Sequence, residues 1–256
     1  MSDQAIQLVQ GDCLEIMPLI PAGSVDMICT DLPYGQVQCA WDVVIPFAPL
    51  WEAYRRLVKP SGAIVLFGCQ PFTSALVMSN PKMFRYSIVW DKVNRITGSL
   101  NCSRMPMRQH EDLLVFYSRL PTYNPQMRIK ERVKCGWKAG HGEHVGHGKD
   151  SERRVATPLR GNEHFPTSIL SVPSGGGDVN GSHPTQKPVA LLEYLIRTYT
   201  NPGDTVLDSC MGSGSTAIAC MRTGRKFIGI EKNADYFEVS CQRVKDEQQQ
   251  GRLFTL

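Results

Sequence analysis

The stretch that decides the fold is Thr205–Glu231, TVLDSCMGSGSTAIACMRTGRKFIGIE. Its first four residues predict a short apolar strand, residues 215–222 predict a helix, and Lys226–Glu231 predicts a second strand. Between the first strand and the helix lies a glycine-rich loop, whose backbone can approach a ligand closely. The amino end of the helix favours an anionic group. The stretch is therefore a strand-helix-strand unit of the kind that binds nucleotides.

Regular elements continue on both sides of this unit. Upstream, Pro188 suits the first turn of a helix, and an apolar face follows at Leu192, Leu195, Ile196 and Tyr199. Downstream, residues 234–246 predict a last helix. These elements make residues 183–256 one half of an α/β domain.

The amino-terminal part, residues 1–95, alternates strands and helices in the same way. Strands are predicted over residues 25–30, 62–67 and 86–90, and helices over residues 47–57 and 71–78, with Lys59–Gly62 ending the first helix. Such alternation predicts an α/β fold: a Rossmann-like, doubly wound, mostly parallel sheet with helices on both faces. We expect the two halves of the chain to complete one sheet.

Between these halves lies a predicted insert, residues 96–182, where the alternation is lost. It has one clear strand, residues 113–117, and two glycine-rich stretches, residues 136–149 and 174–177, that predict loops. From residue 101 to 170 there are 12 Lys/Arg against 7 Asp/Glu, and five of the six histidines lie there too. Clustered positive charge of this kind is the footprint of phosphate contact, although many globular surfaces show as much.

Composition narrows the class of protein. The 9 cysteines are scattered singly, which suits a reducing compartment better than a disulfide framework or a zinc ribbon. No apolar run approaches the ~20 residues that cross a bilayer, and the first residues lack the pattern of a signal peptide. We therefore expect a cytoplasmic protein without a membrane segment.

The ligand of the glycine-rich loop is expected to carry a nucleoside. Glu231 closes the strand about 20 residues after the loop, where an acid can bind ribose hydroxyls. The loop alone does not choose the cofactor, because Gly212, Gly214 and Ala217 also satisfy the dinucleotide fingerprint of dehydrogenases. An oxidoreductase that uses NAD remains an alternative on this motif.

The tetrapeptide Asp31-Leu32-Pro33-Tyr34 indicates the chemistry. It follows the strand of residues 25–30, so it lies at the carboxyl edge of the sheet, where open α/β folds bind ligands. An amino nitrogen on an aromatic ring is a poor nucleophile because its lone pair is delocalised. The carboxylate of Asp31 and the backbone carbonyl of Pro33 can each accept one of its N–H groups and localise that pair, while Tyr34 offers a ring for stacking an extruded base. A bare tetrapeptide of this kind is as often a turn.

The order of these motifs resembles that of the β-class DNA methyltransferases that act on exocyclic amino groups. Gly11-Asp12, the tetrapeptide, an irregular insert, His183–Pro188 (HPTQKP) and the glycine-rich loop follow one another as in that family. The resemblance implies a class I methyltransferase fold, with S-adenosylmethionine as cofactor and Asp31, Pro33 and Tyr34 as catalytic residues. The insert would be the target-recognition region, double-stranded DNA the partner, and a homodimer a possible assembly.

The resemblance also assigns cofactor contacts. Asp208, Gly212, Ser213 and Gly214 would cradle the methionine part, Glu231 the ribose and Asp12 the adenine amine. Thr185 and Lys187 would close the end of the pocket. The full set of expected cofactor contacts is Asp12, Cys13, Asp31, Thr185, Lys187, Asp208, Cys210, Gly212, Ser213, Gly214, Ser215, Thr216 and Glu231. In two places the sequence departs from the family, which commonly has proline where Leu32 stands and phenylalanine where Cys210 stands.

The function we expect is sequence-specific methylation of adenine N6 in DNA, since aspartate at the first tetrapeptide position is commoner in adenine enzymes. Cytosine-N4 methylation, and a DNA-binding protein without catalysis, remain alternatives. Asn94 and a set of cations are expected to contact DNA: Arg95, Arg104, Arg108, Arg128, Lys130, Arg132, Lys134 and Lys138. His141, His144 and His147 lack a paired ligand set, so no metal site is expected.

Overall fold

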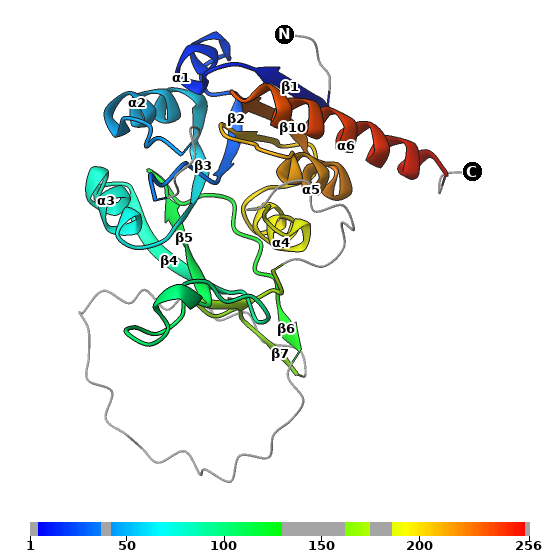
Figure 1. Cartoon of the computed structure of the whole chain (residues 1–256). Helices are drawn as coiled ribbons and strands as arrows, with labels where there is room; N and C mark the ends of the chain where they lie inside the picture. Colours follow the sequence, from blue (N-terminus) through cyan, green and yellow to red (C-terminus); the bar gives the residue numbers. More distant parts are fainter. Residues whose placement is uncertain (1–4, 37–41, 130–161, 175–185, 254–256) are drawn as a thin grey trace, which may run out of the picture. The chain divides into compact units, whose positions relative to one another are not determined.

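The computed structural model describes residues 5–36, 42–129, 162–174 and 186–253. Contacts between residues divide the chain into two units. One comprises residues 1–124 and 167–256, and the other is Pro125–Pro166. The larger unit holds the eight-stranded sheet and its covering helices (Figure 1).

The elements alternate along the larger unit. Its strands are β1 (Ile6–Gln10), β2 (Val25–Thr30), β3 (Val58–Gly68), β4 (Phe84–Asp91), β5 (His110–Phe116), β8 (Ile169–Ser171), β9 (Thr205–Asp208) and β10 (Lys226–Glu231). Its helices are α1 (Cys13–Ile16), α2 (Phe47–Leu57), α3 (Phe72–Ser79), α4 (Val189–Tyr199), α5 (Ser215–Thr223) and α6 (Ala234–Leu253), with short 3-10 turns at Met17–Leu19 and Ser99–Asn101.

The sheet confirms that the two halves of the chain complete one fold. Its strand order is β1-β10-β9-β2-β3-β5-β4-β8, so β9 and β10 from the carboxyl half stand between β1 and β2 from the amino half. The neighbours from β1 to β3 are all parallel, and β8 is parallel to β4. Strand β5 is antiparallel to both β3 and β4. The sheet is therefore mostly parallel, as expected.

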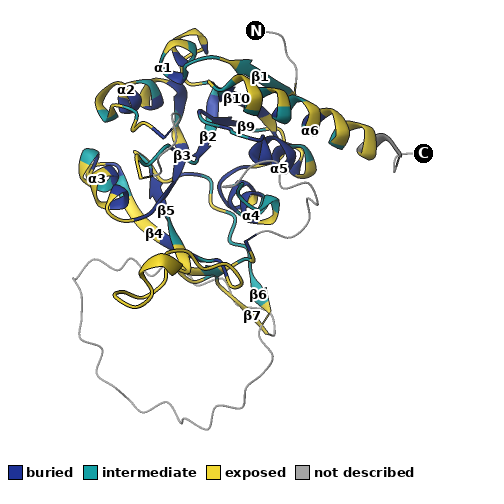
Figure 2. Cartoon of the chain, viewed as in Figure 1, coloured by how far each residue is buried: buried dark blue, intermediate teal, exposed yellow. Residues whose placement is uncertain are grey.

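Helices cover both faces because the strands are apolar on both sides. Ala63, Val65 and Phe67 of β3 pack in one cluster with α4 and α5, whereas Ile64 and Leu66 pack in a second cluster with α1, α2 and α3. In Figure 2 the central strands are dark blue and the outer sides of the helices are yellow. Burial on both faces is the usual state of a parallel sheet between two helix layers.

The prediction that Lys59–Gly62 ends a helix was wrong in one respect. These residues already belong to β3, which begins at Val58 directly after α2. Val58 pairs with Val25, and a register shift in the pairing with β2 absorbs the intervening residues. A Cβ atom on Gly62 would lie 2.7 Å from the backbone oxygen of Asp26, so the glycine allows this close approach of the two strands.

Part of the predicted insert belongs to the central sheet. Strand β5 lies between β3 and β4, and its residues 113–116 are buried. The smaller unit, Pro125–Pro166, lies inside the predicted insert and pairs β6 (Arg128–Ile129) with β7 (Glu163–His164) in antiparallel fashion. The predicted loop of residues 136–149 lies outside the described residues. No helix in the described part of the chain is long and apolar enough to span a membrane.

Candidate active site

Four acidic residues meet at one edge of the sheet. Strands β1, β2, β9 and β10 run parallel, and Asp12, Asp31, Asp208 and Glu231 lie at or just after their carboxyl ends. Between β9 and β2 the chain connections diverge, since β9 continues to β10 on one side and β2 to β3 on the other. This is the switch point at which open α/β sheets bind ligands.

A cavity of about 900 Å³ opens at this edge. Its volume is at the upper end of the ~300–1,000 Å³ usual for ligand sites, so it has room for more than one small group. One set of lining residues surrounds the glycine-rich loop: Gly11, Asp12, Cys13, Asp208, Ser209, Cys210, Met211, Gly212, Ser213, Ser215, Thr216, Glu231, Lys232, Asn233 and Tyr236. A second set surrounds the tetrapeptide: Asp31, Leu32, Pro33, Tyr34, Gln36, Cys69, Trp90, Lys92, Arg95, Thr97, Arg108, Glu111, Ser174, Gln186 and Lys187.

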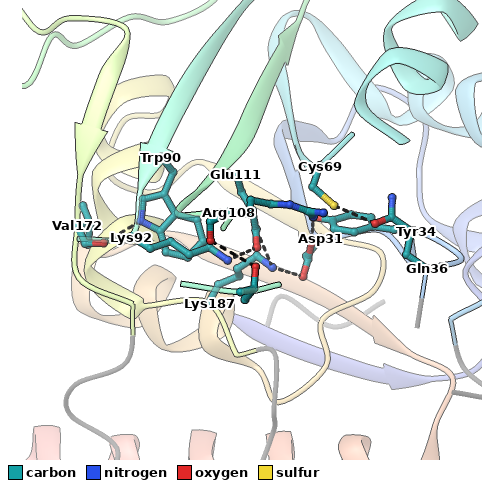
Figure 3. Close-up of polar contacts among 11 residues, drawn as sticks. Asp31, Tyr34, Gln36, Cys69, Trp90, Lys92, Arg108, Glu111, Val172 and Lys187 are labelled. Atoms are coloured by element: carbon teal, nitrogen blue, oxygen red, sulfur yellow. Dashed lines mark hydrogen bonds and ion pairs between the residues drawn. The ribbon is translucent and has the colours of Figure 1, made fainter. Parts of the chain in front are cut away.

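The carboxylate of Asp31 is held from two directions. Its Oδ1 atom accepts a hydrogen bond from the hydroxyl of Tyr34 at 2.7 Å, and its Oδ2 atom lies 2.5 Å from the ammonium of Lys187. Figure 3 shows Tyr34 and Lys187 meeting Asp31 in this way. The side chain is 28% exposed, so part of the carboxylate faces the cavity while both of its oxygens already have a donor.

The rest of the tetrapeptide is fixed by packing. Leu32 is buried in the core cluster below the site, which accounts for an apolar residue at this position. The ring of Tyr34 lies 4.9 Å from that of Phe72. Burial raises the pKa of Tyr34 well above its usual value, and the adjacent charge of Asp31 raises it further. Tyr34 therefore stays protonated and donates to Asp31.

The loop after the tetrapeptide is anchored by Asp42. Its two carboxylate oxygens accept the backbone N–H groups of Gly35 and Gln36 at 2.9 and 2.7 Å. Gly35 has a φ of 68°, which favours glycine. Trp41, which directly precedes Asp42 in the sequence, lies outside the described residues.

A row of alternating charges extends from Asp31. The ammonium of Lys187 also lies 3.3 Å from Oε2 of Glu111, and Oε1 of Glu111 lies 2.5 Å from the ammonium of Lys92. Lys187 stands over the ring of Phe67 at 5.1 Å and Lys92 over that of Trp90 at 5.3 Å. In Figure 3 the side chains of Asp31, Lys187, Glu111 and Lys92 follow one another in a continuous series of contacts.

Mutual attraction keeps Lys187 and Glu111 charged. Burial alone would lower the pKa of Lys187, but Asp31 and Glu111 outweigh it and raise the pKa above its ordinary value. Burial alone would raise the pKa of Glu111, but Lys187 and Lys92 hold it below its ordinary value. Lys187 and Glu111 are therefore an ion pair at neutral pH.

The glycine-rich loop is built around the buried carboxylate of Asp208. Its Oδ1 atom accepts the backbone N–H of Cys210 at 3.1 Å, and its Oδ2 atom accepts the hydroxyl of Thr216 at 2.6 Å. Burial raises the pKa of Asp208 to about 7, even though these two hydrogen bonds oppose the shift. A cationic ligand beside Asp208 would favour its ionised form.

Two further carboxylates stand at the ends of β10 and β1. Glu231 accepts the backbone N–H groups of Gly212 and Asn233 at 2.9 and 2.8 Å, which fixes its orientation beside the loop. Asp12 caps α1 through the N–H of Leu14 at 2.9 Å and lies 3.0 Å from the ammonium of Lys232. That hydrogen bond with Lys232 lowers the pKa of Asp12.

Packing explains two positions of the loop. Gly214 has a φ of 78°, and a Cβ atom there would lie 3.0 Å from Cβ of Ser240 in α6. Cys210 is half-buried and lines the cavity, where its thiol shares a hydrogen bond with that of Cys13. This hydrogen bond, together with burial, raises the pKa of Cys210 well above its usual value. The same hydrogen bond lowers the pKa of Cys13, so a pair of interacting thiols stands where the resemblance led us to expect an aromatic ring.

Most of the predicted site residues line this one cavity. All three predicted catalytic residues do so, as do eleven of the predicted cofactor contacts. Gly214 is not among the lining residues, and Thr185 lies outside the described residues.

The residues predicted to contact DNA are more dispersed. Arg95 and Arg108 line the cavity, whereas Asn94 and Arg104 are exposed outside it. Arg128 belongs to the smaller unit. The remaining four, Lys130, Arg132, Lys134 and Lys138, lie outside the described residues, as do His141, His144 and His147. Within the part of the chain that is described, no three or more His, Cys, Asp or Glu residues cluster as metal ligands would.

Sequence reasoning missed Lys92 and Glu111. Lys92 follows β4, whose carboxyl end lies at the same edge of the sheet as the site. Asp31 was predicted because it directly follows a strand at this edge, and the same reasoning applies to Lys92. Glu111 lies near the start of β5, which runs antiparallel, so its amino end meets the site. The signal in the sequence that could have identified Glu111 is a charged residue at the start of a buried apolar strand.

The polar groups of the cavity suit the predicted cofactor, S-adenosylmethionine. Glu231 and Asp12 offer carboxylate oxygens for hydroxyl and amino groups. The amino end of α5 faces the loop and suits a carboxylate, while the buried Asp208 suits a cationic group. The residues present therefore fit a ligand that carries a nucleoside, a cation and a carboxylate.

Comparison with known proteins agrees with this chemistry. A family model described as DNA methylase, of the N6- and N4-methyltransferase type, matches residues 25–242. Type II methyltransferase M1.MboII from Moraxella bovis is 29% identical over 250 residues, covering 89% of this chain and 92% of its own length. DNA adenine methyltransferase YhdJ from Escherichia coli K12 is 28% identical, covering 94% of this chain and 83% of its own length.

Solved structures share the fold. The M1.HpyAVI-SAM complex matches with a TM-score of 0.60 and 27% identity, covering 93% of this chain and 99% of that one. The cytosine-N4-specific PvuII DNA methyltransferase matches with a TM-score of 0.66 at 16% identity, covering 95% and 93% of the two chains. The family match over residues 25–242, which spans most of the chain, shows that this chain belongs to the DNA methylase family of N6- and N4-methyltransferases.

Proposed function

We propose that this chain transfers the methyl group of S-adenosylmethionine to N6 of adenine in double-stranded DNA. The observation that carries the proposal is the placement of Asp31, because its carboxylate lines the same cavity as the glycine-rich loop of the cofactor. A carboxylate and a cofactor site that share one cavity can bring an amino group and a methyl donor together.

The residues of the tetrapeptide would act on the amino group. Asp31 and the backbone carbonyl of Pro33 accept its two N–H groups, which localises the nitrogen lone pair for in-line attack. Tyr34 stacks against the extruded base, a contact worth about 1 to 3 kcal/mol. S-adenosylmethionine, when bound, supplies a methyl group activated by a sulfonium. No covalent enzyme intermediate is required.

The cofactor residues divide into three groups by chemistry. Glu231 accepts ribose hydroxyls, Asp12 accepts the adenine amine, and Asp208 with the loop backbone holds the methionine part. Support for this cofactor comes from the family match and from the M1.HpyAVI-SAM complex, together with the carboxylates that line the cavity.

Adenine is favoured over cytosine on two grounds. The first tetrapeptide residue is aspartate, and one of the similar enzymes, YhdJ, is named a DNA adenine methyltransferase. Cytosine-N4 methylation is the second candidate, since a cytosine-N4-specific enzyme shares the fold.

Arginines around the cavity would guide the duplex. Arg95 and Arg108 line the same cavity as Asp31, so they are available to phosphates that flank an extruded base. We further propose that the part of the insert, residues 96–182, that lies outside the strands of the central sheet reads the target sequence, which the local excess of positive charge over residues 101–170 supports.

The direct test is an incubation with labelled S-adenosylmethionine and mixed-sequence duplex DNA, followed by digestion and identification of the methylated nucleoside. N6-methyladenosine is the expected product. N4-methylcytosine would overturn the adenine assignment, and no labelled nucleoside would overturn the function.

A matched pair of variants tests the role of Asp31. Asp31→Ala should abolish transfer and leave cofactor affinity, measured by calorimetry, nearly unchanged, because Asp31 acts on the base. Asp112→Asn is the control for loss of a carboxylate elsewhere in the fold. The carboxylate of Asp112 accepts a hydrogen bond from the hydroxyl of Thr73 at 2.9 Å and does not line the cavity. Loss of cofactor binding in Asp31→Ala would contradict this division of roles.

A further inference from the structure

The proposed function uses Asp31 and leaves Glu111 without a role. We propose that Glu111 is a positioning residue for methyl transfer: it is the second carboxylate onto which Lys187 shifts when the target amino group takes over Oδ2 of Asp31. This inference rests on the proposed function and deepens it.

The free protein already has a donor on each oxygen of Asp31. Tyr34 donates to Oδ1 at 2.7 Å, and the ammonium of Lys187 lies 2.5 Å from Oδ2. An ammonium carries a full charge, so it binds a carboxylate more strongly than the N–H of a neutral aromatic amine does. Lys187 therefore competes with the substrate for the oxygen that the chemistry needs.

Glu111 offers the ammonium a second partner without any backbone movement. Its Oε2 atom is 3.3 Å from the same nitrogen of Lys187, so a small displacement of that nitrogen exchanges one carboxylate for the other. Lys187 is 11% exposed and Glu111 13% exposed. Both side chains are therefore largely shielded from solvent. If the ammonium left Asp31 without reaching another carboxylate, it would be an unpaired buried charge, which is strongly unfavourable.

Lys92 keeps Glu111 available for this exchange. Its ammonium lies 2.5 Å from Oε1 of Glu111, on the oxygen that Lys187 does not use. The two cations and two carboxylates of the row sum to zero charge, and a neutral amine entering beside Asp31 leaves that sum unchanged. Lys187 can therefore remain protonated throughout.

The test compares three single variants at saturating cofactor. Glu111→Gln keeps the size of the side chain and removes its charge, so Lys187 should stay on Asp31. The rate constant kcat should then fall about 10- to 100-fold, which corresponds to the free energy of one hydrogen bond to a charged group. The affinity for S-adenosylmethionine should change little. Glu111→Asp retains the charge and should recover part of the lost rate.

Asp112→Asn is the matched control for loss of a carboxylate from β5. Its side chain accepts a hydrogen bond from Thr73 and does not line the cavity. It should leave kcat near the wild-type value. Circular dichroism and thermal midpoints of each variant identify any that fail to fold.

A double-variant cycle separates positioning from a general structural role. In a Lys187→Met background no ammonium competes for Asp31, so adding Glu111→Gln should cost little further rate. An equal cost of Glu111→Gln in both backgrounds, a wild-type kcat in Glu111→Gln, or parallel losses of kcat and cofactor affinity would each overturn the inference. A wild-type protein that methylates no DNA would overturn the proposed function itself, and the wild-type reaction alone reveals that outcome.

Discussion

Replacing Asp208 by asparagine should change how the stability of the protein depends on pH. The pKa of Asp208 is raised from 3.8 to about 7 by burial, so the folded protein holds this proton where the unfolded chain has released it. The free energy of unfolding must then fall as pH rises through the window between these two values. An asparagine side chain releases no proton in this range, so the variant lacks this contribution.

The magnitude follows from the shift. Each pH unit within the window between the two pKa values changes the free energy of unfolding by about 1.4 kcal/mol. Between about pH 5 and pH 8 the wild-type protein should therefore lose about 2 to 3 kcal/mol of unfolding free energy relative to Asp208→Asn. Other titrating groups are common to both proteins, so they cancel in the difference.

Urea denaturation of both proteins at intervals across this pH range measures the difference. Glu238→Gln, which removes a carboxylate from the exposed side of α6, is the control for net charge. Affinity for the cationic cofactor should rise with pH in the wild type, because ionised Asp208 attracts it, and should be flatter in the variant. A stability difference that stays constant across the range would refute the reasoning about Asp208.

Two substitutions test the packing beneath the site. Gly214→Ala places a Cβ atom 3.0 Å from that of Ser240 at a φ of 78°, so it should lower the unfolding free energy by about 1 to 3 kcal/mol and weaken cofactor binding. Denaturation and calorimetry measure both effects, and wild-type values would show that the loop tolerates a side chain. Leu32→Ala removes a side chain that is 4% exposed and should cost about 2 to 5 kcal/mol. A thermal midpoint equal to that of the wild type would contradict its assignment to the core.

The elements nearest the cofactor loop could be predicted from sequence with little error. Residues 25–30 and 205–208 form β2 and β9 with the predicted bounds, since each is a short apolar run that ends at a turn. The start of β3 could not be predicted, because proline, serine and glycine favour turns locally. Pairing with β2 across a bulge overrides that local preference, and pairing between distant strands is invisible in a local pattern.

By itself the sequence located the two motifs, Asp31 to Tyr34 and the loop from Asp208, at the carboxyl ends of two strands, because residues adjacent in the chain keep a fixed local relation to the strand they follow. Only the tertiary structure decided that Glu111 and Lys92 join Asp31 through Lys187. These four side chains come from four separate segments, and the direction of β5 in the sheet brings Glu111 to the site. A buried row of charges depends on distances of a few ångströms between such segments, and those distances arise only when the sheet has formed.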